Sequence, residues 1–112
     1  MRTEDQDALP VLRGFRGGRP LTFGAMLRAL RRCDEVPLTT WAARLGITKQ
    51  HLSDIERGRR AVSVERAAAW AETLGYPAGP FVTLALQAQV DAAALPFAVS
   101  LGPRPRRGRR AA

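Results

Sequence analysis

The stretch TWAARLGITKQHLSDIERG, residues 40–58, decides the fold of this 112-residue chain. Trp41, Ala42 and Leu45 are apolar at the spacing of a helix rather than of a strand. Gly46 follows them and can adopt the left-handed conformation that ends a helix at low cost. The stretch is therefore predicted to begin with a short helix that ends in a tight corner.

A second short helix is expected directly after this corner. Ile47 would fill the inside of the corner, and Thr48 is a favourable N-cap for the next helix. Leu52 and Ile55 lie three residues apart, so both would point inward. The polar side chains of this helix are then left facing outward, namely Lys49, Gln50, His51, Ser53 and Asp54.

The outward residues have the chemistry that the DNA major groove requires. Lysine can reach the O6 and N7 atoms of guanine, glutamine can bond to adenine through two atoms, and serine suits either base. A three- or four-residue corner sets the two helices at the steep angle that lets the second one enter the groove. The pair of helices therefore predicts a nucleic-acid-binding unit.

The segment LGITKQHLSDIERGRR, residues 45–60, resembles the corner, recognition helix and Glu-Arg-Gly exit of the lambda-repressor/Cro-type helix-turn-helix family. The likeness extends from about residue 23 to residue 74. Ala42, the Leu-Gly-Ile-Thr corner and the Ile-Glu-Arg-Gly exit all stand in register, which makes the resemblance specific. It implies a compact helical bundle whose function is to bind double-stranded DNA and regulate transcription.

The resemblance also implies roles for individual residues. In the family, the two residues after the corner threonine read bases, which implies this role for Lys49 and Gln50. The position of Asp54 also reads a base, and Ser53 and His51 are further candidates. Glu56 would be a structural brace, and Asp54 would either face a cytosine or pair with Arg57. Phosphate contacts are implied for Thr48, Arg57, Arg59 and Arg60. Pro37 and Leu38 stand where the family has a cap and a phosphate-binding glutamine, so Thr39 or Thr40 would have to supply that contact.

The charge of the chain is unevenly distributed. The net charge is +8, but residues 22–101 hold nine Lys/Arg and seven Asp/Glu, whereas the segment from Gly102 onward holds five arginines and no acid. Any groove-sized positive surface must therefore come from clustering of side chains and not from bulk charge. We interpret residues 102–112 as a disordered Arg-rich tail that either adds non-specific phosphate affinity or only keeps the chain in solution.

The composition argues against several other classes of protein. A single histidine and a single cysteine are too few for a zinc site, and no nucleophile–base pair or strand–Gly-loop–helix pattern is present, so we expect no enzyme, metal or cofactor. Cys33 is interpreted as a small filler on the first helix. An acidic start without an apolar segment and the lack of a membrane span predict a cytoplasmic protein.

The remainder of the chain is predicted to complete a five-helix bundle over residues 21–94. Residues 1–20 are interpreted as a flexible arm, with a basic arm in the DNA minor groove as the alternative. Thr22 would cap a first helix on which Arg28, Arg31 and Arg32 face outward. Pro37 would open the second helix, and Ser63 would cap the fourth, which closes at Gly75. A fifth helix is expected from about Pro80 to Ala93.

Residues 95–101, LPFAVSL, alternate apolar and small side chains with the period of a strand. A lone strand has unpaired backbone groups, and we expect it to pair with a second copy through Phe97, Val99 and Leu101. The alternatives are a strap over the bundle or a strand that joins another protein.

The sequence thus predicts an all-α, lambda-repressor-like bundle with a short C-terminal strand. We expect a repressor that binds an inverted repeat as a homodimer, with no cofactor. An autoregulating antitoxin with a toxin partner, a phage or mobile-element repressor, and an adaptor that kept the fold without DNA binding remain open.

Overall fold

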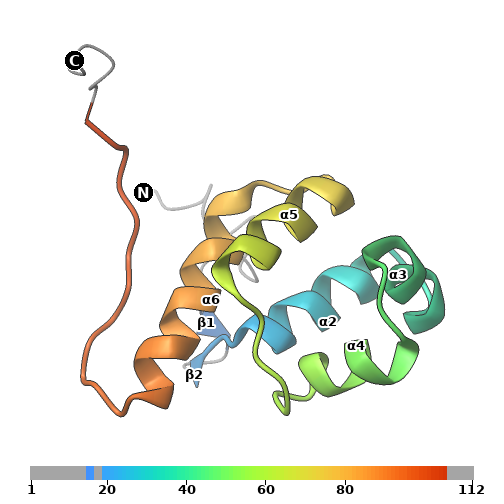
Figure 1. Ribbon diagram of the computed structural model, residues 1–112, viewed down its shortest axis with the longest axis horizontal. Helices are drawn as coiled ribbons and strands as arrows, with labels where there is room; N and C mark the ends of the chain where they lie inside the picture. Colours follow the sequence, from blue (N-terminus) through green and yellow to red (C-terminus); the bar gives the residue numbers. More distant parts are fainter. Residues whose placement is uncertain (1–14, 17–18, 106–112) are drawn as a thin grey trace.

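The computed structural model describes residues 15–16 and 19–105, and helices dominate this part of the chain (Figure 1). The elements in chain order are β1 (Phe15–Arg16), β2 (Arg19–Pro20), α2 (Phe23–Cys33), α3 (Leu38–Leu45), α4 (Lys49–Glu56), α5 (Val64–Leu74) and α6 (Ala78–Ala92). The five helices confirm the predicted all-α bundle. No helix of the described part is long and apolar enough to cross a membrane.

The helix boundaries follow the capping residues of the sequence. The side-chain oxygens of Thr22, Thr48 and Ser63 each accept a hydrogen bond from the backbone N–H three residues later, at 3.0–3.1 Å. Gly46 and Gly75 end α3 and α5 in the left-handed conformation, with φ of +73° and +84°. These five caps confirm the predicted helix ends.

Two boundaries involve proline. Pro37 has a φ of −65° and directly precedes α3, which confirms that it opens this helix. The last helix begins at Ala78 and ends at Ala92, slightly earlier than predicted, and Pro80 lies within its first turn. A proline is tolerated there because the first N–H groups of a helix have no intrahelical partner.

The core lies where all five helices meet. The largest fully buried side chains are Trp41, Phe81, Met26, Leu27, Leu52 and Ile55. Phe81 of α6 contacts Phe23 edge-on at 5.8 Å between ring centroids and stacks on Tyr76 at 6.1 Å. These ring contacts join the start of α2 to α6.

Gly24 permits the closest helix contact in the core. A Cβ atom at this position would lie 2.1 Å from the carbonyl oxygen of Ile55 and 2.9 Å from that of Glu56. No side chain fits between these backbones, so the start of α2 touches the end of α4 directly. This contact sets the position of α4, which is the helix expected to enter DNA.

The N-terminal arm contains a described hairpin that the sequence analysis did not predict. Strands β1 and β2 pair antiparallel, with Phe15 opposite Pro20 and Arg16 opposite Arg19. The sequence between them is Gly-Gly, which is typical of a two-residue hairpin connection. The remaining parts of the predicted arm, and of the Arg-rich tail beyond residue 105, lie outside the described residues.

The C-terminal strand predicted for residues 95–101 is not present. These residues are irregular, and the one ladder in the described part of the chain joins β1 to β2. The side-chain amide of Gln87 holds them instead. Its nitrogen donates to the carbonyl of Phe97 at 2.9 Å, and its oxygen accepts from the N–H of Val99 at 2.7 Å. Beyond the backbone bond from the Leu95 N–H to the Val90 carbonyl at 3.1 Å, the segment is therefore tied to α6 through the side chain of Gln87.

Candidate nucleic-acid interface

Helices α3 and α4 form the predicted corner at one side of the bundle (Figure 1). The N–H of Ile47 donates to the carbonyl of Ala42 at 3.0 Å, which closes the turn after α3. Ile47 itself is half-buried, whereas Leu52 and Ile55 of α4 are almost completely buried. Packing therefore fixes one face of α4 on the core, and the opposite face is left to contact a ligand.

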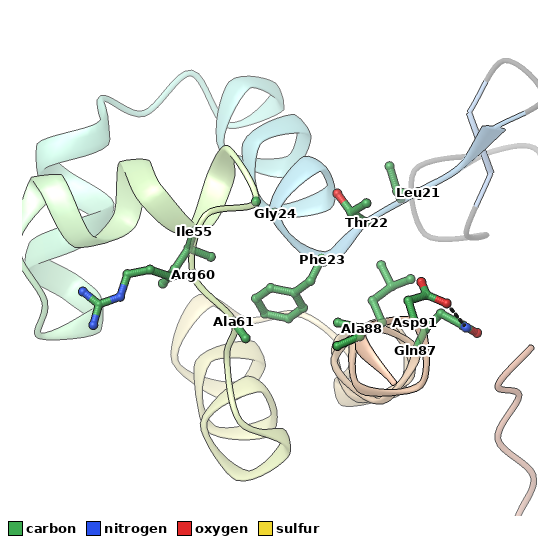
Figure 2. A pocket seen from close by; sticks show the side chains of 13 residues that line it. Leu21, Thr22, Phe23, Gly24, Ile55, Arg60, Ala61, Gln87, Ala88 and Asp91 are labelled. Carbon is green, nitrogen blue, oxygen red and sulfur yellow. Dashed lines mark hydrogen bonds between the residues drawn. The ribbon is translucent and has the colours of Figure 1, made fainter. Parts of the chain in front are cut away.

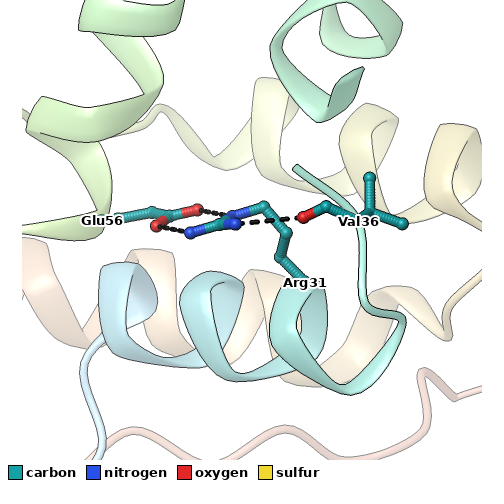
Figure 3. Close-up of polar contacts among 3 residues, drawn as sticks. All are labelled: Arg31, Val36 and Glu56. Atoms are coloured by element: carbon teal, nitrogen blue, oxygen red, sulfur yellow. Dashed lines mark hydrogen bonds and ion pairs between the residues drawn. The ribbon is translucent and has the colours of Figure 1, made fainter. Parts of the chain in front are cut away.

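An ion pair with two hydrogen bonds fixes the end of α4. Arg31 of α2 donates from Nε to Glu56 Oε2 at 2.8 Å and from Nη2 to Oε1 at 2.9 Å (Figure 3). A third bond, from Nη1 of Arg31 to the carbonyl of Val36, lies at 3.1 Å. Hydrogen bonding to Glu56 raises the pKa of Arg31. Glu56 is thus confirmed as a brace, and the expectation that Arg31 faces outward is wrong because its partner lies across the helix interface.

The two residues that follow Thr48 are the most accessible part of α4. Lys49 and Gln50 are both exposed, while His51, Ser53 and Asp54 are half-buried. The five predicted base readers therefore share one short helix, but they differ in how freely a ligand can reach them. Lys49 and Gln50 stand at the front of this surface.

Asp54 connects Gln50 to the residues that follow the helix. Its Oδ1 atom accepts a hydrogen bond from Nε2 of Gln50 at 3.0 Å and lies 3.6 Å from Nη1 of Arg59. The predicted pairing of Asp54 with Arg57 is wrong. Arg57 occupies the C-cap, and the chain reversal beyond it brings Arg59 to the aspartate instead.

Gly58 makes this reversal possible. Its φ is +80°, and its N–H donates to the carbonyl of Ile55 at 3.0 Å while the N–H of Arg59 donates to the carbonyl of Asp54 at 2.7 Å. The turn leaves the side chains of Arg57, Arg59 and Arg60 exposed next to the end of α4. Three arginines are thereby clustered beside the exposed helix, although the bundle as a whole is only mildly basic.

The surroundings of His51 disfavour its positively charged form. Partial burial lowers its pKa, and the positive charges of Arg60 and Arg66 lower it further, against a smaller raising effect of Asp54. The lowered pKa reduces the contribution of His51 to the positive charge of the surface.

The start of α3 supplies two exposed hydroxyl groups. Thr39 and Thr40 are exposed, whereas Leu38 is half-buried against the core. Leu38 therefore acts as a packing residue at a position where the family would place a phosphate-binding glutamine. Thr48, at the start of α4, is exposed as well.

The predicted dimerisation residues lie on the C-terminal segment beside α6, at the other side of the view from α3 and α4 (Figure 1). Phe97 is 62% exposed and Leu101 is 49% exposed, while Val99 is half-buried. Leu95 is also exposed, so three large apolar side chains of one short segment face solvent in the single chain.

A groove of about 460 Å³ lies between the start of α2, the α4–α5 connection and α6 (Figure 2). Phe23, Ala61 and Ala88 form its apolar walls. Gln87 and Asp91 stand at its rim, where the amide nitrogen of Gln87 donates to the carboxylate at 2.9 Å.

Two features of the site were not found from sequence, the contact at Gly24 and the pairing of Arg31 with Glu56. A glycine inside an apolar helical pattern is a signal that often marks a close packing contact. Cys33 was interpreted as a filler, which is wrong because it is exposed. In the described part of the chain, no three His, Cys, Asp or Glu residues are grouped as they would be around a metal ion.

Comparison of the chain with curated proteins and with solved structures gives no match. The helix-turn-helix family model, by contrast, matches residues 27–81. This range contains both helices of the corner, the arginine-rich exit and all of α5. The match over residues 27–81 therefore confirms the resemblance to the lambda-repressor/Cro-type helix-turn-helix family that residues 45–60 predicted.

Proposed function

We propose that this protein is a sequence-specific regulator of transcription that binds double-stranded DNA with α4 in the major groove. The observation that carries the proposal is the contrast between the two faces of α4. Lys49 and Gln50 are exposed, whereas Leu52, Ile55 and Glu56 are buried on the opposite face. A helix held rigidly from behind, with a lysine and a glutamine in front, has the form of a reading helix.

Base recognition falls first to these two exposed side chains. Lys49 would donate to guanine, and Gln50 would bond to adenine. Ser53 and His51 are half-buried and would reach a base only deeper along the groove. Because its surroundings disfavour the charged imidazolium, His51 would act as a hydrogen-bonding group.

Phosphate binding would come from both ends of α4. Arg57, Arg59 and Arg60 are exposed at its exit, and Thr48 lies at its start. The Thr48 oxygen already accepts from the N–H of His51 at 3.0 Å, but its hydroxyl hydrogen remains available for a phosphate oxygen. Thr39 and Thr40 would add a contact from the start of α3, replacing the family's glutamine.

The protein would bind as a homodimer on an inverted repeat, with half-sites about 34 Å apart. Support comes from the exposed side chains of Leu95, Phe97 and Leu101. Gln87 occupies the Phe97 carbonyl and the Val99 N–H, which leaves the Ala98 N–H and C=O without a partner in the described part of the chain. Two such segments could exchange these bonds antiparallel across a two-fold axis.

Repression by occupation of a promoter is the regulatory mode we propose, and such a protein would act in the cytoplasm. An antitoxin that regulates its own gene is the first biological setting, with the C-terminal segment as the surface for a toxin. A phage or mobile-element repressor is the second. The packing role of Leu38 favours a third possibility, an adaptor without DNA binding, but the exposed Lys49 and the three exit arginines weigh against it.

Selection of bound duplexes from a random DNA pool, followed by gel shift at several salt concentrations, tests the proposal. We expect an enriched motif with two-fold symmetry. Gln50→Ala should cost about 1–3 kcal/mol at one base position, whereas Arg59→Ala should weaken binding to all sequences and lower the log–log salt slope by about one. Gln89→Ala, an exposed glutamine on α6, is the matched control. Failure to enrich any duplex contradicts the proposal.

The dimer is tested separately by light scattering on the full chain and on a chain that lacks residues 95–112. We expect the full chain to have twice the mass of a single copy and the shortened chain to lose this association. A dimer that survives the deletion would place the interface elsewhere.

A further inference from the structure

We propose that Asp54 is a positioning residue which fixes the orientation of the Gln50 amide and so makes Gln50 selective for adenine over guanine. This inference rests on the proposed DNA binding through α4. It reverses the role that the family pattern implies for Asp54, which is direct contact with a base. The evidence is the hydrogen bond from Gln50 to Asp54, together with the ion pair between Asp54 and Arg59, at the surface of the reading helix.

The chemistry of the two side chains decides which one donates the hydrogen bond between Gln50 and Asp54. An aspartate carboxylate has no hydrogen to donate, so it can only accept. The end of the Gln50 amide that lies 3.0 Å from Asp54 Oδ1 must therefore be the NH₂ group. The carbonyl oxygen of Gln50 is then turned away from Asp54. A free glutamine has no such preference, because its two amide orientations are nearly equal in shape.

A fixed Gln50 presents one N–H donor and one carbonyl acceptor to the groove. Adenine offers the matching pair, an acceptor at N7 and a donor at N6, whereas guanine offers two acceptors at N7 and O6. With one N–H held by Asp54, Gln50 cannot supply two donors to guanine, and its carbonyl oxygen would face the guanine O6. Asp54 thereby makes Gln50, which could otherwise bond to either purine, selective for adenine.

Arg59 makes a carboxylate acceptable at this position. Its Nη1 atom lies 3.6 Å from Asp54 Oδ1, and the backbone bond from the Arg59 N–H to the Asp54 carbonyl, at 2.7 Å, keeps the two residues together. The positive charge offsets the repulsion between Asp54 and the DNA phosphates. The Arg59 side chain is 61% exposed, so its other N–H groups remain free for phosphate.

The test measures base preference in the full chain, for the wild type and for Asp54→Asn. The duplexes differ only at one base pair. This is the base pair at which Gln50→Ala abolishes the preference. Asparagine keeps the size and a hydrogen-bonding partner for Gln50 but allows both amide orientations. We expect the wild type to prefer adenine over guanine by about tenfold or more, and Asp54→Asn to reduce this to about threefold or less. Asp54→Ala should reduce it similarly, and it serves if the asparagine variant folds poorly.

Asp91→Asn is the matched control, because Asp91 accepts from Gln87 four residues earlier at 2.9 Å on α6. It removes the same kind of pair away from α4 and should leave base preference unchanged. An unaltered adenine preference in Asp54→Asn would overturn the inference. A change of base preference at a different base pair would also overturn it, because Asp54 would then read that base directly. Both results leave DNA binding intact. Absence of any binding by the wild type would instead contradict the proposed function.

Discussion

The guanidinium of Arg31 and the carboxylate of Glu56 join α2 to the end of α4 through two hydrogen bonds, at 2.8 and 2.9 Å. The side chain of Glu56 is only 5% exposed and that of Arg31 is 15% exposed. Both charges have therefore lost most of their water and depend on each other. Since Arg57 follows Glu56 directly, the pair also fixes the point at which the arginine-rich exit leaves the bundle.

We expect Glu56→Ala to destabilise the fold by about 2–4 kcal/mol, because it leaves Arg31 largely buried without its partner. Urea denaturation followed by circular dichroism measures this change. Glu72→Ala removes an exposed glutamate from α5 and should cost less than about 0.5 kcal/mol. Equal effects of the two substitutions would show that the Arg31–Glu56 pair does not stabilise the bundle. Replacing both Arg31 and Glu56 by apolar residues should cost less than the two single changes added together.

Gly24→Ala should destabilise the protein by about 2–3 kcal/mol although alanine is the better helix former. The added methyl group would lie 2.1 Å from the Ile55 carbonyl oxygen, so α2 and α4 would have to separate. Gly79→Ala is the control, because a Cβ atom at this position of α6 meets nothing within 4 Å. It should be neutral or stabilising by up to about 1 kcal/mol. Thermal unfolding of both variants gives the comparison, and a neutral Gly24→Ala would contradict the close helix contact.

The sequence predicted features that depend on neighbouring residues. Thr48, Ser63 and Gly46 each act on their own helix end, so their capping roles can be inferred without knowledge of the fold. The same holds for the corner and for the exposure of Lys49 and Gln50, because helical periodicity alone separates inner from outer positions.

Features that depend on distant residues were missed or wrong. Arg31 pairs with a residue 25 positions away, and its apparent outward position gave no sign of Glu56. Asp54 reaches Arg59 rather than Arg57 because the left-handed turn at Gly58 changes the spacing after the helix. The alternation of residues 95–101 has the period of a strand. A strand forms only when it pairs with a second strand, however, and sequence alternation does not identify that partner.

The phenol of Tyr76 should titrate far above its usual range. Burial raises its pKa to about 12, and the hydrogen bond from its hydroxyl to Asp34 Oδ2, at 2.9 Å, acts in the same direction. An acid with a raised pKa in the folded state favours folding below its unfolded pKa of about 10, and this contribution is lost as the pH rises from about 10 to about 12. Tyr76 is the only tyrosine, so ultraviolet absorbance of the phenolate reports on it alone.

Asp34→Asn should lower the pKa of Tyr76 without returning it fully to about 10, because the burial remains. The stability of Tyr76→Phe should fall less steeply than that of the wild type between pH 10 and 12. If the phenol of the folded wild type titrates near pH 10, as it does in the denatured chain, the contact with Asp34 is not formed in solution.

Gln87 should control how firmly the C-terminal segment is held. Its amide makes bonds of 2.9 Å to the Phe97 carbonyl and 2.7 Å to the Val99 N–H, and no other hydrogen bond to residues 96–105 is present in the described part of the chain. We expect Gln87→Ala to speed chymotrypsin cleavage after Phe97 several-fold, since cleavage requires the segment to leave α6. Mass spectrometry of timed digests identifies the cut. Gln89→Ala, an exposed glutamine of the same helix, should cleave at the wild-type rate, and a Gln87→Ala variant that does the same would show that the side chain does not retain the segment.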